Sequence, residues 1–190
     1  MNTLKAEKRS MDVKAKKLRR EGFVTGNLFG REIEGSIPLK FTKKEIEVLL
    51  KNNNKGSQVM LELDGKTYDA LIKEVDYNPL AHTVEEVDFQ ALVSNEMVHS
   101  TAEIILENEE KVLSGVLQDE LKEVAYKALP ADLVDKIKVD VAGMKIGDTL
   151  RVKDLEIAKN KNIHITTDPE AVVATVTPVH NVVPETETEA

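Results

Sequence analysis

Hydrophobic and polar positions alternate along most of the chain with a period of two residues. Successive side chains of a strand point to opposite faces, so this alternation predicts half-buried β-strands. The chain is therefore predicted to be mainly β with short helices. The predicted strands cover residues 4–10, 23–29, 33–41, 58–63, 66–75 and 83–91 in the first half, and 98–106, 112–117, 120–128, 136–141, 155–158, 162–166 and 171–177 in the second.

Two short segments have the period of a helix instead. Thr42 and Glu45 form a capping box, and the apolar residues after it are spaced at i, i+3 and i+4, which predicts an amphipathic helix over 43–51. A second helix is predicted between Asp12 as N-cap and Gly22 as the stop signal. It carries few apolar residues, so it needs a strand platform or an RNA to order it.

Turn residues divide the strands and suggest how they group. Asp64-Gly65 joins two alternating segments and predicts a tight hairpin. Pro38 inside a predicted strand favours an edge or a bulge. Several short strands with two helices predict a small N-terminal β-barrel over residues 1–93. A second, mainly β C-terminal domain is predicted over 94–182, and the acidic segment 183–190 is predicted to be disordered.

Composition narrows the class of protein. The chain has 190 residues, of which 41% are hydrophobic and 4% aromatic, so its cores are expected to consist of Val, Ile and Leu. No run approaches the roughly 20 apolar residues that cross a bilayer, and the N-terminus lacks the apolar centre of a signal peptide. Without Cys there is no disulfide or Cys-based zinc site. We therefore expect a cytoplasmic protein with no membrane partner.

The charge is distributed unevenly. Residues 1–95 carry 16 Lys and Arg against 15 Asp and Glu, whereas residues 96–190 carry 10 against 19. Within residues 1–20 there are eight basic side chains against two acidic ones. Such a block favours a nucleic acid or another acidic surface, although a solvated helix face is the alternative. On the predicted helix, Lys16, Arg19 and Arg20 share one face and Lys17 lies beside it.

The joint order of several short motifs resembles a known family, the long form of the bacterial large-subunit ribosomal protein twenty-five, also called the general stress protein Ctc family. The resemblance covers almost the whole chain. In the first half the matching motifs are Leu4-x-Ala6-Glu7-x-Arg9, Lys17-Leu18-Arg19-x-x-Gly22, Phe29-Gly30 and Val87-Asp88-Phe89. In the second half they are Gly115-Val116-Leu117, Ala128-Leu129-Pro130-Ala131-Asp132-Leu133, Ile137-Lys138-Val139-Asp140, Ile146-Gly147-Asp148 and Asp154-Leu155.

The resemblance implies a barrel that docks on 5S rRNA and partners in the large ribosomal subunit. It also implies an RNA surface, because Lys and Arg neutralise phosphates and RNA is recognised largely by shape and backbone. The sequence departs from the family pattern at this surface: Phe29 replaces a Tyr, and Glu86 replaces the His of a His-x-Asp pair. The candidate RNA-binding residues are Arg9, Lys14, Lys16, Lys17, Arg19, Arg20, Phe29 and Asp88.

An enzyme is not expected. The four His residues are scattered, and His82 to Glu86 resembles a zinc motif but ends in Glu. No Gly-rich loop with Lys and Ser or Thr cradles a phosphate. We therefore expect no catalytic residues, no metal, no cofactor and no small-molecule substrate.

Two functions remain open. The first is a structural large-subunit ribosomal protein that binds 5S rRNA through its N-terminal domain and is ribosome-associated in the cytoplasm. The alternative is a stress-related paralogue with the same fold that binds 5S rRNA weakly and acts through protein contacts. Glu86 and the small basic excess of residues 1–95 motivate the alternative.

Overall fold

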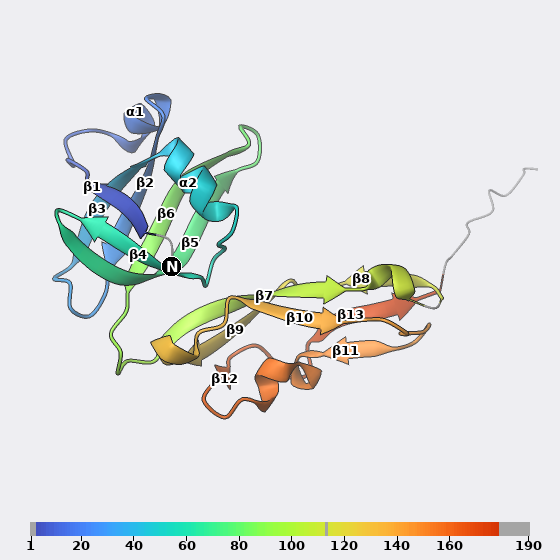
Figure 1. The fold of residues 1–190 in the computed structure, drawn as a ribbon. Coiled ribbons are helices and arrows are strands. Elements are labelled where there is room, and N and C mark those ends of the chain that lie inside the picture. The colour runs from blue at the N-terminus through green and yellow to red at the C-terminus, as the bar shows by residue number, and fades with distance from the viewer. Residues whose placement is uncertain (1–2, 113, 179–190) are drawn as a thin grey trace, which may run out of the picture.

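The computed structural model describes residues 3–112 and 114–178. Figure 1 shows a rounded N-terminal half connected to an elongated, strand-rich C-terminal half. The first six strands close into a barrel in the order β1-β3-β2-β6-β5-β4. This confirms the predicted N-terminal β-barrel. Its strands are β1 (Thr3–Lys8), β2 (Phe23–Phe29), β3 (Ser36–Thr42), β4 (Gln58–Leu63), β5 (Lys66–Asn78) and β6 (Thr83–Ala91).

The barrel interior is filled by alternate residues of each strand. β1 with β4 and β2 with β6 pair in parallel, and the other neighbours pair antiparallel. Phe41 and Phe89 meet inside, with ring centroids 5.4 Å apart and the planes tilted by 55°. Around them lie buried aliphatic side chains, as the low aromatic content predicts. They include Val24, Leu28, Leu39, Leu61, Ile72 and Val87.

Two helices cover parts of the barrel. The capping box of α2 (Lys43–Leu50) is confirmed, because Thr42 Oγ1 accepts from the Glu45 amide at 3.3 Å and Glu45 Oε2 accepts from the Thr42 amide at 3.2 Å. Helix α1 (Ala15–Arg20) begins later than predicted, with Lys14 rather than Asp12 at its N-cap. Asp12 instead accepts a hydrogen bond from Ser10 Oγ at 2.9 Å in the preceding turn.

The stop of α1 and the position of Pro38 test two of the local sequence rules. Gly22, with φ +88°, follows the C-cap residue of α1 as predicted. Pro38 lies on β3, which pairs with both β1 and β2, so it is not on an edge strand, but it comes one residue beyond the last pair that β3 makes with β1. Its missing N–H is tolerated because it lies beyond the residues that β1 pairs, where its carbonyl accepts from the Arg9 amide at 2.9 Å.

The C-terminal half consists of two sheets and confirms the mainly β prediction. One sheet has the order β10-β7-β9-β12 and contains β7 (Val98–Glu107), β9 (Glu123–Ala128), β10 (Lys136–Asp140) and β12 (His164–Ile165). The other has the order β11-β13-β8 and contains β8 (Val116–Asp119), β11 (Thr149–Arg151) and β13 (Val172–Thr177). Short 3₁₀ helices lie between these strands along the chain: η1 (Glu109–Lys111), η2 (Pro130–Asp132), η3 (Val152–Asp154) and η4 (Glu156–Lys159).

A second apolar core lies between these sheets. Tyr126 is fully buried within it, and its hydroxyl donates to the Val134 carbonyl at 2.7 Å and accepts from the Val134 amide at 2.8 Å. That core shares no residue with the core of the barrel. The division of the chain at residues 93 and 94 stays a prediction. The predicted disordered tail, 183–190, lies outside the described residues.

The strand predicted at 155–158 was wrong, because η4 occupies it. Leu155 and Ile157 are buried while Glu156 and Ala158 are exposed, so the burial alternates although the backbone is not a strand. β8 begins four residues after the predicted start, since Val112 is the C-cap of η1. Among the described helices, none has the length and apolar character required to cross a membrane.

Candidate nucleic-acid interface

Phe29, Glu86 and Asp88 lie on strands β2 and β6 of the barrel, whereas the candidate cations lie on helix α1 and in the segment before it. Leu28 and Phe89 point inward, so the alternating positions Thr25, Asn27 and Phe29 of β2, and Glu86 and Asp88 of β6, point outward. Helix α1 leads directly into β2 and is anchored by Leu18, which is 6% exposed. The basic helix and the outer face of β2 and β6 are therefore adjacent.

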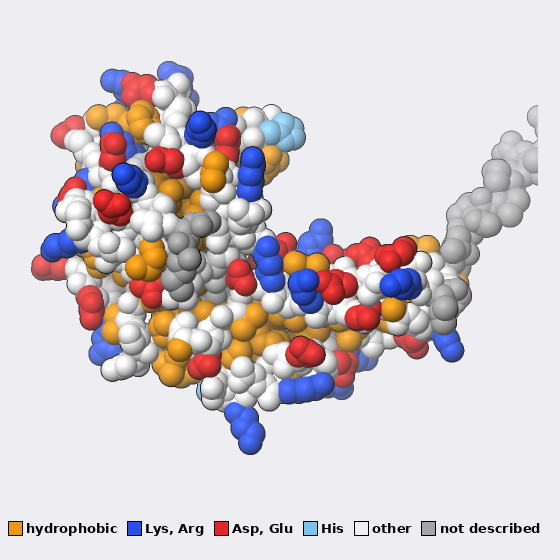
Figure 2. Space-filling view, in the orientation of Figure 1, with side chains coloured by type: hydrophobic (Ala, Val, Ile, Leu, Met, Phe, Trp, Pro, Cys, Tyr) orange, Lys and Arg blue, Asp and Glu red, His pale blue; other side chains and the backbone are white. Residues whose placement is uncertain are grey.

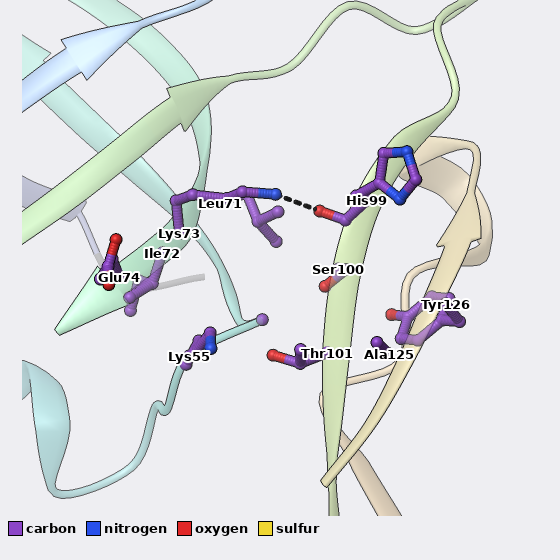
Figure 3. A pocket seen from close by; sticks show the side chains of 11 residues that line it. Lys55, Leu71, Ile72, Lys73, Glu74, His99, Ser100, Thr101, Ala125 and Tyr126 are labelled. Carbon is purple, nitrogen blue, oxygen red and sulfur yellow. Dashed lines mark hydrogen bonds between the residues drawn. The ribbon is translucent and has the colours of Figure 1, made fainter. Parts of the chain in front are cut away.

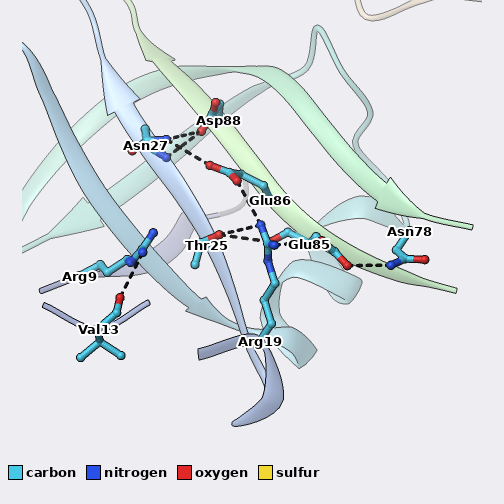
Figure 4. Close-up of polar contacts among 9 residues, drawn as sticks. All are labelled: Arg9, Val13, Arg19, Thr25, Asn27, Asn78, Glu85, Glu86 and Asp88. Atoms are coloured by element: carbon cyan, nitrogen blue, oxygen red, sulfur yellow. Dashed lines mark hydrogen bonds and ion pairs between the residues drawn. The ribbon is translucent and has the colours of Figure 1, made fainter. Parts of the chain in front are cut away.

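Arg19 connects α1 to β6. Its guanidinium forms ion pairs with Glu85 Oε2 at 3.0 Å and with Glu86 Oε2 at 3.2 Å, as Figure 4 shows. Its Nε also donates to the Glu85 carbonyl at 3.1 Å. Arg19 is 30% exposed and already holds two carboxylates. A phosphate that approached it would compete with these internal partners.

Asp88 fastens β6 to β2. Its Oδ1 accepts from the backbone amide of Asn27 at 2.9 Å and from Asn27 Nδ2 at 3.0 Å (Figure 4). The same Asn27 Nδ2 donates to Glu86 Oε1 at 3.3 Å. Asp88 therefore bonds across to the neighbouring strand and does not contact Arg19, which Glu85 and Glu86 orient instead.

Arg9 fixes the loop that precedes α1. Its Nη2 donates to the Val13 carbonyl at 3.1 Å, and its Nε is buried without a hydrogen-bonding partner among the described residues. The side chain is half-buried. Arg9 thus holds the approach to α1 and keeps only part of its guanidinium accessible.

The remaining cations of the helix are exposed. Lys14, Lys16, Lys17 and Arg20 all lie at the surface, and Lys17 approaches Glu21 at 3.8 Å. Within the described part of the chain, no ion pair involves Lys14, Lys16 or Arg20. The predicted shared face of Lys16, Arg19 and Arg20 is therefore split, because Arg19 turns to the strands.

Phe29 lies at the far end of β2 from α1. It is half-buried and pairs in register with Ser36 of β3 and Gln90 of β6. It is four positions along the strand from Thr25, a distance of about 13 Å. The structure therefore does not bring Phe29 next to the basic helix, although both border the same outer surface.

Acidic residues missed by the sequence analysis adjoin this surface. Glu74 and Asp76 of β5 pair in register with Asp88 and Glu86 of β6, and the four line a small cavity of about 130 Å³. Their i, i+2 spacing on two strands was the signal that could have revealed them. Within residues 3–112 and 114–178, no group of three or more His, Cys, Asp or Glu is arranged to hold a metal ion.

The crowding of these carboxylates changes the pKa of Glu86. Burial and the nearby Asp88 carboxylate raise the pKa of Glu86 above its ordinary value of 4.5, and Arg19 offsets only part of the rise. A raised pKa means that the folded protein favours the neutral carboxyl more than the unfolded chain does. Glu86 therefore contributes least to stability when it is ionised, above its folded pKa, and contributes more as the pH falls toward 4.5.

Replacing Glu86 by Gln is expected to flatten this pH dependence. The neutral amide keeps one oxygen, which can accept from Arg19 or from Asn27, and Arg19 retains Glu85 as a partner. Because the substitution removes the charge that burial and Asp88 oppose, stability at pH 7 should equal or exceed that of the original chain. The loss of stability between pH 4.5 and pH 7 that Glu86 causes should disappear. Urea midpoints measured across this range give the comparison.

Glu47→Gln, an exposed carboxylate on α2, is the matched control for that substitution. It removes the same charge without touching Arg19 or Asp88. If Glu86→Gln lowers the urea midpoint at pH 7 more than Glu47→Gln does, the Arg19 ion pair outweighs the crowding and the account of Glu86 is wrong.

Comparison with known proteins decides the family. Residues 4–89 match the family model of the Ribosomal L25p family, and residues 97–180 match that of Ribosomal protein TL5, C-terminal domain. The Large ribosomal subunit protein bL25 of Carboxydothermus hydrogenoformans is 32% identical over 190 residues, covering 95% of this chain and 94% of that protein. The chain belongs to the bL25 family.

Other bL25 proteins match over similar lengths. That of Bacillus velezensis is 31% identical over 183 residues, covering 94% of this chain and 89% of its own. That of Thermoanaerobacter sp. strain X514 is 29% identical over 164 residues, covering 85% and 81%. A bL25 protein is a structural ribosomal protein of the large subunit, found with the ribosome in the cytoplasm, and is not an enzyme. The stress-protein name stays a prediction, and nothing in these matches favours the stress-related alternative.

Proposed function

We propose that this bL25 protein binds 5S rRNA through the outer face of its barrel, with helix α1 as the main phosphate contact. The observation that carries the proposal is the exposure of Lys14, Lys16 and Arg20 beside β2 and β6, where no carboxylate in the described chain neutralises them. Cations in such a position release counterions when they meet phosphates, which makes binding favourable and sensitive to salt.

The other candidate residues have distinct proposed roles. Arg9 and Arg19 contact phosphate through the part of each guanidinium that stays accessible, while their internal bonds hold α1 against the barrel. Lys17 adds charge at the edge of the helix. Phe29 offers a half-buried ring on which a base can stack, and Asp88 keeps β2 and β6 in register.

The C-terminal half is proposed to face away from the RNA. Residues 96–190 carry 19 acidic against 10 basic residues, which disfavours contact with phosphates. Figure 2 shows apolar side chains gathered over the C-terminal sheets and charges of both signs interspersed over the barrel. We propose that this half contacts proteins of the large subunit, and that residues 1–93 and 94–182 are separate domains.

Titration of the full chain with 5S rRNA tests the proposal. A length-matched unrelated RNA serves as the control, and both are titrated at 50 and 200 mM salt. We expect 5S rRNA to bind at least ten-fold more tightly than the control RNA, and both affinities to fall as salt rises. Equal, micromolar or weaker binding to both RNAs would contradict 5S recognition.

Glu86→His is expected to tighten 5S rRNA binding. The substitution removes an anion beside the proposed phosphate contacts and introduces a donor, while Arg19 keeps Glu85 as a partner. A charge near a phosphate contributes on the order of 1 kcal/mol, so we expect about a five- to ten-fold gain in affinity. An unchanged affinity would show that Glu86 does not face the RNA. Glu47→His on α2 is the matched control, expected to have no effect.

A further inference from the structure

A cavity of about 250 Å³ lies between the barrel and the sheet of the C-terminal half, and Glu74 on its wall also lines the small acidic cavity beside the proposed RNA surface. Figure 3 shows it between β5 and β7, with Lys73 extended from β5 toward β7 and the Thr101 hydroxyl directed back toward Lys55. Both halves of the chain supply its walls. The barrel contributes Lys55 and Lys73, and β7 contributes Ser100 and Thr101.

The walls are held close together by contacts on either side of the cavity. Gly56 lies so near β7 that a Cβ there would be 1.9 Å from the Thr101 carbonyl oxygen. Lys73 Nζ donates to the His99 carbonyl at 2.7 Å, and Ser57 Oγ donates to Asp135 Oδ2 at 3.2 Å. The two walls of the cavity are therefore held in place by direct contacts between the barrel and the C-terminal half.

Two hydroxyls in the cavity have unused hydrogen-bonding capacity. Ser100 is only 5% exposed, and neither its Oγ nor Thr101 Oγ1 has a hydrogen-bonding partner among the described residues, although the Tyr126 hydroxyl lies on the Ser100 side of the sheet. Buried polar groups are nearly always bonded, so such hydroxyls indicate a bound molecule or ordered water. The volume has room for several waters, since one water occupies about 30 Å³ of liquid.

The charged groups around the cavity are two lysines and two carboxylates. Burial and the nearby Lys55 ammonium lower the pKa of Lys73, which records two cations in a partly desolvated space. Lys73 has three donors and uses one on His99. Two acids are also near, because Glu74 lines the cavity and Glu123 approaches Lys55 at 3.6 Å. These carboxylates oppose any anion, so an anion in the cavity has to be small enough to reach Lys55 and Lys73 without approaching Glu74 and Glu123.

We propose that this cavity binds the phosphate group of a small molecule or free phosphate, clasped by Lys55 and Lys73 from the barrel and by the Ser100 and Thr101 hydroxyls from β7. Ammonium and hydroxyl donors on opposite walls match the acceptor oxygens of a phosphate. Because both walls contribute, the ligand connects the barrel to the C-terminal sheet. Its occupancy stabilises their present arrangement.

Inorganic phosphate titrated into the full chain tests the site, by calorimetry and by thermal unfolding against chloride at equal ionic strength. We expect phosphate to raise the unfolding temperature above the chloride value, as a ligand of the folded state does. Lys73→Gln and Thr101→Val should each weaken phosphate binding by on the order of ten-fold. Thr101→Val keeps the shape of the side chain and leaves the Lys73 bond to His99 intact.

Lys66→Gln, an exposed lysine at the start of β5, is the matched control and should bind phosphate as the original chain does. No difference between phosphate and chloride would show that water fills the cavity and would overturn the proposal. The proposal would also be overturned if phosphate bound equally well to the original chain and to all three variants. A short single-stranded RNA that displaces phosphate would overturn the assignment to a small ligand.

Discussion

The triple variant Lys14→Gln, Lys16→Gln and Arg20→Gln is expected to bind 5S rRNA about 10- to 100-fold more weakly than the original chain at 100 mM salt. These side chains are exposed, and no ion pair in the described chain engages them, so they are the cations most free to meet phosphates. Each lost phosphate contact should reduce the slope of log affinity against log salt by about 0.7 to 0.9. Affinities measured at four salt concentrations give both quantities.

The control is a second triple variant, with Lys44→Gln, Lys51→Gln and Lys66→Gln. These lysines are also exposed, but Lys44 lies on α2, Lys51 follows α2, and Lys66 begins β5. The control removes the same charge from the barrel. If both triple variants lose the same affinity and slope, the binding depends on net charge and not on helix α1, and the proposed surface is wrong. The fold should persist in both, since none of the six side chains is buried.

Gly26→Ala is expected to destabilise the barrel by on the order of 3 kcal/mol or more, enough to unfold a marginal domain. Gly26 lies on β2 against its parallel neighbour β6. A Cβ there would be 2.0 Å from the Val87 carbonyl oxygen and 3.4 Å from a carbon of the Phe41 ring. The backbone would have to separate β2 from β6, and the Asn27 to Asp88 bond would be lost with it. Urea unfolding followed by circular dichroism measures the loss.

Gly65→Ala on the hairpin between β4 and β5 is the matched control. Gly65 has φ +76° and open space around its Cβ position, so alanine there is strained but meets no atom. Its cost should be about 1 to 2 kcal/mol. If the Gly26→Ala protein is at least as stable as the Gly65→Ala protein, the close approach of β2 to β6 does not require glycine at position 26, and the expected clash is wrong.

Local patterns in the sequence predicted most of the barrel. The strands β2, β4 and β6 have the predicted bounds, and the capping box of α2 is present, because each depends on residues close together in the chain. The same local rules failed where tertiary contacts decide. Asp12 had the chemistry of an N-cap but Ser10 engages it, and Leu155 to Ala158 alternates in burial within a 3₁₀ segment.

The site was harder to predict because its contacts join distant residues. Arg19 and Glu86 are 67 positions apart, and Asn27 and Asp88 are 61 apart. Only the closed barrel brings β2 beside β6 and aligns Glu74 and Asp76 with Asp88 and Glu86. The sequence therefore indicated which residues carry charge, while the structure distinguishes the cations that are exposed from those held by carboxylates.

Hydrogen–deuterium exchange of the full chain with and without 5S rRNA tests most directly whether the barrel face binds this RNA. Amides of α1, β2 and β6 are expected to exchange more slowly in the complex, while those of β7 to β13 should keep their free rates, and a length-matched unrelated RNA should protect none of them to the same degree. Protection confined to the C-terminal sheets, or equal protection by both RNAs, would contradict the account.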